Sequence, residues 1–106
     1  MYIQVNTGHN TDGRERVAMY VRGIVRSAVG HFSNDLTRVE VHLGDENGAR
    51  SGPDDKRCMM EARVAGRQPI AVTYYGASLN QAIDGAAAKL KRALERQLYK
   101  RREHRP

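Results

Sequence analysis

The stretch Thr-Arg-Val-Glu-Val-His-Leu at 37–43 decides the fold of this 106-residue chain. Apolar and polar side chains alternate through it, which predicts a β-strand with one face toward a core and the other toward water. The inward side chains are Val39, Val41 and Leu43. A strand with a single apolar face is covered on that side only, so we expect the helices to share one face of the sheet.

Three other segments alternate in the same way, at 2–5, 57–64 and 70–75. The polar loop 44–56 precedes the second of them, and Gly66-Arg67-Gln68 joins the second to the third as a hairpin-length turn. The residues expected to point inward from these strands are Ile3, Val5, Cys58, Met60, Ala62, Val64, Ile70, Val72 and Tyr74. The last three strands of the chain therefore form an antiparallel meander.

Two segments carry apolar residues at three- and four-residue steps, which predicts amphipathic helices. The first runs from about 13 to 30, with Thr11 or Asp12 as its cap and Gly30 as its end. The second follows the cap Ser78, and its apolar stripe consists of Leu79, Ile83, Ala86, Ala87, Leu90, Leu94 and Leu98.

The predicted order of elements is β-α-β-β-β-α, an α+β fold with a four-stranded mixed sheet and two helices packed on one face. A right-handed crossover makes the first two strands parallel. A chain of this length buries enough surface for one core without disulfides. We therefore assign residues 1–106 to a single domain.

The basic residues are concentrated at one end of the chain. Residues 1–88 hold ten basic and ten acidic side chains, whereas 89–106 hold eight basic and two acidic ones, so this end carries the whole net charge of +6. Such a block is typical of a protein that binds a polyanion. A solvated helix end also favours cations, but eight are more than that explanation needs.

Helical geometry places four of these cations together. At about 100° per residue they fall within an arc of about 80°, away from the apolar stripe. These residues are Lys89, Arg92, Arg96 and Lys100. Arg22 and Arg26 lie off the apolar stripe of the first helix. Arg101 has the azimuth of the stripe itself, so we expect the helix to run past the core, or to fray, over about 100–106.

No residue set indicates catalysis or metal binding. The histidines do not occur at metal-ligand spacing, Cys58 has no cysteine partner, and no glycine-rich phosphate loop is present. Asp54 and Asp55 fit a solvated turn. An RNA hydrolase could use His42 and Glu40, but strand alternation often places two such residues on one face. We expect no enzyme, no metal, no cofactor and no small-molecule substrate.

The sequence also predicts where the protein works. No apolar run approaches the roughly 18–20 residues of a membrane span, and Met1–Asn6 lacks the features of a signal peptide. The expected location is cytoplasmic. The outward sheet face carries Tyr2 and Tyr75 among glutamates, a poor platform for stacking bases. A basic helix flank instead suits the phosphate backbone of folded RNA.

Taken together, these segments make the chain resemble the ribosome hibernation promoting factor family, whose members are also described as modulators of an alternative sigma factor. The resemblance covers essentially the whole chain. It rests on Ile3-Gln4-Val5, on the stretch 37–43, on Ser78-Leu79-Asn80-Gln81-Ala82-Ile83-Asp84, and most strongly on Lys89-Leu90-Lys91-Arg92-Ala93-Leu94-Glu95-Arg96-Gln97-Leu98-Tyr99-Lys100.

The resemblance implies a fold similar to double-stranded-RNA-binding domains and binding to the small ribosomal subunit, in the channel for messenger and transfer RNA. Basic residues on the helices would contact 16S rRNA, and occupation of the channel would block translation under stress. The matching positions here are Lys89, Arg92, Arg96 and Lys100, and further ones are Lys91, Arg22 and Arg26. The free protein is expected to be monomeric.

Three departures from the family pattern stand out. His9 follows Gly8 where a cation is common, and Asn80-Gln81 replaces an acidic and aromatic pair. The chain ends at Pro106 without the dimerisation domain of long members, so it resembles a short form. Two other functions remain open: a general RNA-binding or chaperone-like module, and a protein-interaction regulator.

Overall fold

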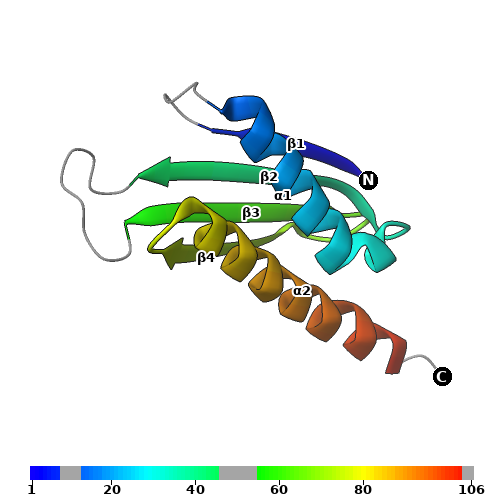
Figure 1. The fold of residues 1–106 in the computed structure, drawn as a ribbon. Coiled ribbons are helices and arrows are strands. Elements are labelled where there is room, and N and C mark those ends of the chain that lie inside the picture. Colours follow the sequence, from blue (N-terminus) through cyan, green and yellow to red (C-terminus); the bar gives the residue numbers. More distant parts are fainter. Residues whose placement is uncertain (8–12, 46–54, 104–106) are drawn as a thin grey trace.

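The computed structural model describes residues 1–7, 13–45 and 55–103. Its elements follow the predicted order β-α-β-β-β-α, with one short 3-10 turn added (Figure 1). They are β1 (Tyr2–Asn6), α1 (Arg14–Val29), the 3-10 turn η1 (Gly30–Phe32), β2 (Leu36–Asp45), β3 (Lys56–Val64), β4 (Ile70–Gly76) and α2 (Leu79–Glu103). The predicted α+β fold is confirmed.

The four strands form one mixed sheet in the order β1-β2-β3-β4. β1 pairs in parallel with β2, which is the consequence of the α1 crossover, and β2, β3 and β4 form an antiparallel meander. Val41 lies opposite Met60, and Met60 lies opposite Val72, so the inward side chains of neighbouring strands meet in register. This register puts every predicted apolar face on the same side of the sheet.

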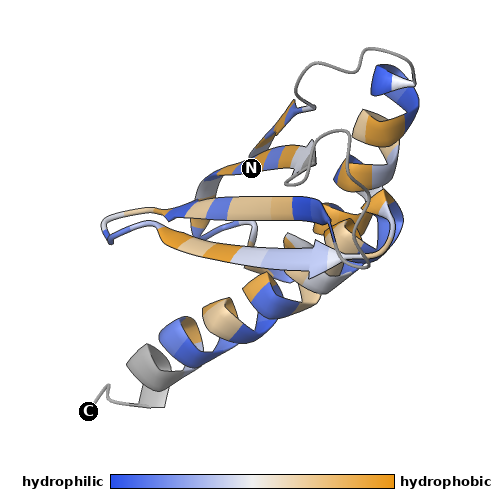
Figure 2. Ribbon diagram, turned by 90° about the vertical axis from the view of Figure 1, so that its left-hand side faces the viewer, coloured by the Kyte–Doolittle hydropathy of each residue, from blue (hydrophilic) through white to orange (hydrophobic). Residues whose placement is uncertain are grey.

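Both helices cover that one side (Figure 1), and neither of them packs on the other face of the sheet. Hydropathy alternates along the strands, as expected for a sheet covered once (Figure 2). The largest fully buried side chains are Phe32, Met60, Ile83, Leu90 and Leu94, together with Val21, Val25, Val29, Val39, Val41 and Cys58. The core therefore lies between the sheet and the two helices.

The two ends of α1 differ from the sequence-based expectation. The N-cap is Gly13, with φ of 73°, rather than the predicted Thr11 or Asp12, which lie outside the described residues. Glycine adopts this left-handed conformation at little cost, which allows the chain to enter the helix there. The α-helix ends at Val29, and η1 continues the chain so that Phe32 enters the core.

The start of α2 has the predicted cap. The backbone N–H of Gln81 donates to Ser78 Oγ at 3.1 Å, and the backbone N–H of Ala77 donates to Gln81 Oε1 at 3.2 Å. This reciprocal pair fixes the first turn of the helix against β4. The helix then extends past the end of the sheet to Glu103 (Figure 2), and Leu98 is the last core residue along it.

The burial of Asp55 also differs from the sequence-based expectation. A solvated turn predicts an exposed carboxylate, but Asp55 is only 4% exposed, and its Oδ1 lies 3.7 Å from Nζ of the neighbouring Lys56. Asp54 lies outside the described residues. Burial beside a cation gives Asp55 a structural role at the start of β3.

Candidate nucleic-acid interface

One flank of α2 faces the edge strand β4. Gly85 identifies it, because a Cβ atom on Gly85 would fall 2.2 Å from ring atoms of Tyr74. Lys89, Arg92 and Arg96 follow Gly85 by four, seven and eleven residues, which places them on the same flank. We refer to these three residues as the cationic flank.

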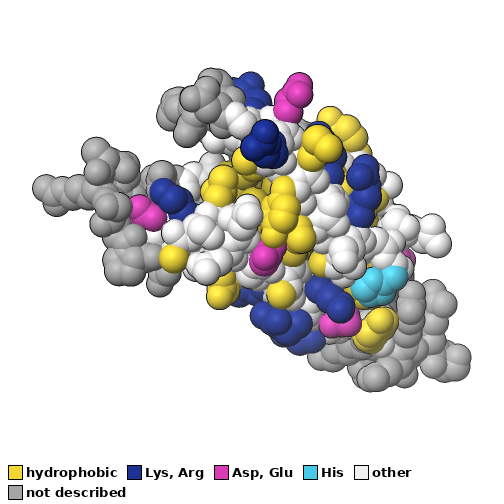
Figure 3. Space-filling model, in the orientation of Figure 1, with side chains coloured by type: hydrophobic (Ala, Val, Ile, Leu, Met, Phe, Trp, Pro, Cys, Tyr) yellow, Lys and Arg dark blue, Asp and Glu magenta, His cyan; other side chains and the backbone are white. Residues whose placement is uncertain are grey.

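The cationic flank is open to solvent. The side chains of Lys89, Arg92 and Arg96 are exposed, and none forms an ion pair within the part of the chain that the structure describes. Lys89 Nζ donates to the Thr73 carbonyl oxygen at 3.0 Å, which holds this side chain along β4. Figure 3 shows Lys and Arg side chains gathered at the lower edge of α2. Their positive charge is therefore available to an external anion.

Lys91 lies on the opposite flank of α2. It follows Asp84 by seven residues, and Asp84 Oδ1 accepts a hydrogen bond of 2.7 Å from Tyr20 of α1. This bond raises the pKa of the Tyr20 phenol, because the neighbouring carboxylate opposes its ionisation. The flank that faces α1 also carries Glu95, four residues after Lys91. The structure thus separates Lys91 from the cationic flank.

Arg22 and Arg26 lie on another side of the molecule. At 100° per residue they are about 200° and 240° around α1 from Tyr20, which faces α2. They therefore project from the flank of α1 that faces away from α2. Lys100 follows Arg96 by four residues within α2, but its side chain lies outside those that the structure describes.

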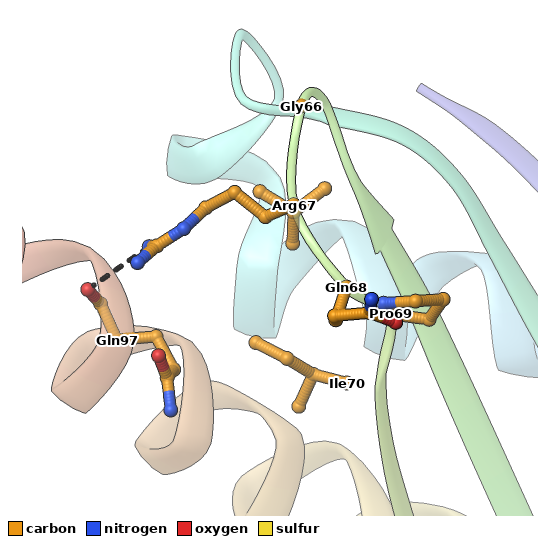
Figure 4. A pocket seen from close by; sticks show the side chains of 7 residues that line it. Gly66, Arg67, Gln68, Pro69, Ile70 and Gln97 are labelled. Atoms are coloured by element: carbon orange, nitrogen blue, oxygen red, sulfur yellow. Dashed lines mark hydrogen bonds between the residues drawn. The ribbon is translucent and has the colours of Figure 1, made fainter.

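Arg67 is a cation that the sequence analysis missed. It lies in the turn between β3 and β4, where Gly66 has φ of 73°, and its Nη1 donates to the Gln97 carbonyl oxygen at 3.2 Å (Figure 4). An open pocket of about 730 Å³ lies between this turn and α2, lined by Val64, Gly66, Arg67, Gln68, Pro69, Ile70 and Gln97. The bond brings Arg67 beside the turn of α2 that carries Arg96.

No local pattern could have identified Arg67. Its contact with Gln97 joins residues 30 positions apart and exists only because α2 crosses the end of the β3–β4 hairpin. A single arginine in a polar turn is ordinary in sequence. The tertiary packing alone places it near the cationic flank.

The outer face of the sheet carries basic residues of a different kind. Glu40, whose side chain is 15% exposed, lies 3.3 Å from Nη2 of Arg63, 3.5 Å from Nε of Arg38 and 3.8 Å from Nε2 of His42. Arg63 also pairs with Glu61 at 3.5 Å. Arg38 contacts the Gln4 amide oxygen and lies over the Tyr2 ring. These cations already have partners within the sheet.

The described residues offer little for covalent chemistry. Burial raises the pKa of the Cys58 thiol to about 12, so the reactive thiolate does not form near neutral pH. No group of three His, Cys, Asp or Glu side chains in 1–7, 13–45 and 55–103 could hold a metal ion. Within the same described residues, every helix is too short or too polar to cross a membrane.

The fold and the cationic flank define a small, basic, two-layer α+β domain. The sequence model of the Sigma 54 modulation protein / S30EA ribosomal protein family matches residues 4–102, and the chain belongs to this family. The resemblance inferred from the sequence is thereby confirmed. Among proteins with curated descriptions, none matches the chain.

Several solved structures share the fold, and two of them illustrate the likeness. The N-terminal domain of Protein Y from Thermus thermophilus superposes with a TM-score of 0.71 at 21% identity, covering 92% of this chain and 99% of that one. A ribosomal subunit interface protein from Coxiella burnetii gives 0.67 at 12% identity, covering 93% and 99%. At these identities the likeness supports the fold alone.

Proposed function

We propose that this protein is a ribosome-associated hibernation factor. It binds the small ribosomal subunit in the channel for messenger and transfer RNA, contacts phosphates of 16S rRNA, and blocks translation under stress. The observation that carries the proposal is the exposed cationic flank of α2, which has no ion pair among the described residues, whereas Arg38 and Arg63 on the sheet face pair with Glu40 and Glu61. Membership of the family supports the ribosome as the partner.

The chemistry of the flank suits a phosphate backbone. Arg92 and Arg96 present planar guanidinium groups that bind phosphate oxygens in pairs, and Lys89 adds a point charge. Neutralised phosphates release condensed counterions, which supplies most of the binding free energy at low salt. The flank offers no set of side chains for reading base sequence, so we propose recognition of RNA shape.

The proposed rRNA-binding residues fall into two groups. Lys89, Arg92, Arg96 and Lys100 bind one RNA segment along the flank that faces β4. Lys91, Arg22 and Arg26 project in other directions, so they contact rRNA only where the channel wraps around both helices. Residues 1–106 act as one ribosome-binding domain.

Other properties follow from this function. The protein acts in the cytoplasm, is monomeric when free, and needs no cofactor, metal or small-molecule substrate. It is not an enzyme, because its effect arises from occupying a site that translation requires.

Titration of purified small subunits with the full chain tests the proposal. We expect saturation at one copy per subunit, measured by co-sedimentation, and displacement of the chain by transfer RNA. A general RNA-binding module would show neither saturation nor competition. A protein-interaction regulator would retain a partner after nuclease treatment. Either of these results would contradict the proposal.

A further inference from the structure

A notch of about 460 Å³ opens where β4 meets the first turns of α2. It lies beside the cationic flank, because Gly85 on its wall precedes Lys89 by one helical turn. Its lining residues are Tyr74, Tyr75, Gly76, Gln81, Asp84 and Gly85. The Tyr74 ring, the backbone of β4 and residues of the first turns of α2 therefore border one opening.

Tyr74 is the floor of the notch. The sequence pattern predicts this residue inside the core, but it is 42% exposed, because β4 is the edge strand and α2 covers only part of the ring. The covered part packs against the backbone at Gly85, where a Cβ atom would overlap the ring at 2.2 Å. A ring seated on a helix backbone with open area remaining is a preformed stacking surface.

The polar groups of the notch are half used by the protein itself. Gln81 Oε1 accepts the Ala77 N–H, which leaves the amide nitrogen to donate. Asp84 Oδ1 accepts the Tyr20 hydroxyl, which leaves the second carboxylate oxygen to accept. Gln81 and Asp84 both line the notch, so its lining offers one donor and one acceptor, which suits the base-pairing edge of adenine or cytosine, where a ring-nitrogen acceptor lies next to an amino group.

The charge of the notch favours a base over a phosphate. The Asp84 carboxylate repels an anion placed inside the opening, whereas Lys89 lies one turn along α2 and attracts an anion just outside it. A nucleotide bound here would place its base on Tyr74 and its phosphate at the start of the cationic flank. The notch and the flank thus fit successive parts of one RNA strand.

We propose that this notch binds one unpaired adenine or cytosine of the bound RNA, stacked on Tyr74. The inference rests on the proposed function, since the same RNA strand occupies the cationic flank. It adds a base contact to a surface that otherwise recognises only phosphates. Tyr74 is therefore a binding residue on the helix side of β4, distinct from the outward-facing Tyr2.

The test compares a short oligoadenylate with an abasic chain that has the same number of phosphates. We expect the full-length protein to bind the oligoadenylate about 5- to 150-fold more tightly, the range for stacking one base on an aromatic ring. Tyr74→Leu should abolish this preference, and Tyr74→Phe should keep it. Tyr2→Leu, a matched change of an exposed tyrosine on the outer face of the sheet, should have no effect.

The second measurement is the affinity of the Tyr74 variants for small ribosomal subunits. Tyr74→Leu should weaken binding to them at least about 5-fold at constant salt. Two results would overturn the proposal that the notch binds a base: equal binding of the unmodified protein to both oligonucleotides, or an unchanged affinity of Tyr74→Leu for small subunits. The proposed function would still stand if binding to small subunits saturates at one copy. A protein that binds neither oligonucleotides nor small subunits overturns both.

Discussion

The outer face of the sheet and the cationic flank of α2 both carry arginines, but only the sheet provides their counterions. Arg38 and Arg63 lie beside Glu40, and Arg63 also pairs with Glu61. Arg92 and Arg96 have no such carboxylate among the residues that the structure describes. Pairing, rather than the number of basic residues, therefore distinguishes a structural surface from a candidate binding surface.

The reason for this difference lies in the geometry of the two elements. Strands gather side chains on one face at short range, both along a strand and across to its neighbour. The register sets Arg38 opposite Arg63 and Glu40 opposite Glu61, so the ion pairs of β2 and β3 form diagonally and between alternate residues of one strand. On a helix flank at the edge of a domain, the nearest side chains are those three and four residues away along the same helix. When those neighbours are also basic, the charge stays uncompensated until an external anion binds.

The largest expected effect comes from reversing charge on the cationic flank. Arg92→Glu with Arg96→Glu should weaken binding to small subunits by about 100-fold or more, because two phosphate contacts become repulsive. Co-sedimentation at fixed salt measures this loss.

The matched control is Arg14→Glu with Arg16→Glu, which makes the same charge change at the exposed start of α1. Acidic residues are favourable at a helix N-terminus, so the fold should tolerate them. Beyond about 8 Å such charges are screened at physiological salt, and affinity should stay within about threefold. Equal losses in both variants would show that net charge, not the flank, determines binding.

The salt dependence of RNA binding should distinguish the cationic flank from the outer face of the sheet. With about six phosphate contacts, the slope of log affinity against log salt should lie near −4 to −5. Arg92→Gln should reduce its magnitude by about 0.7–0.9, and Arg63→Gln should leave it unchanged, because Arg63 is already paired. Titrations over a series of salt concentrations give these slopes. A smaller slope for Arg63→Gln would place the sheet face in the interface.

A smaller effect is expected from removing the charge of Glu40. Glu40→Gln leaves Arg38 and Arg63 without this partner, so the free energy of unfolding should fall by about 1 kcal/mol. Non-specific RNA binding should rise slightly as the sheet face becomes more positive. Denaturant titration measures the first change, and Glu95→Gln on α2 serves as the control that should not alter stability. A Glu40→Gln variant as stable as the parent would mean that the sheet cations are not held by pairing.

The smallest expected effect concerns Cys58, which reports whether these variants keep their fold. The raised pKa of about 12 and the burial of the thiol should make it unreactive toward thiol reagents at neutral pH in the parent and in all charge variants. Since the pKa in the folded state lies above that of the unfolded chain, burial contributes stability below about pH 9, and this contribution is lost as the pH rises toward 12. Rapid labelling in a native variant would contradict the buried position.

Most of the fold could be predicted from local pattern. Each element buries one face, and the order of apolar and polar residues reveals that face. Examples are the alternation around Val39 and Val41 and the apolar stripe through Ile83 and Leu90. The start of α1 could not be predicted, because Thr11 and Asp12 are good caps and only the path of the chain assigns the position to Gly13.

The candidate site was only partly predictable. A helical period groups Lys89, Arg92 and Arg96 on one flank whatever surrounds the helix. The contribution of Arg67, and the separation of Arg22 from the flank, depend on which neighbour each helix face meets. That information arises from packing between distant segments, such as the bond from Arg67 to Gln97.

A cryo-EM map of the small ribosomal subunit with this protein bound would show which surface of the protein touches RNA. We expect one copy in the channel for messenger and transfer RNA, with Lys89, Arg92 and Arg96 against 16S rRNA phosphates and the sheet face with Glu40 turned away. A copy bound through the sheet face, or outside the channel, would contradict this expectation.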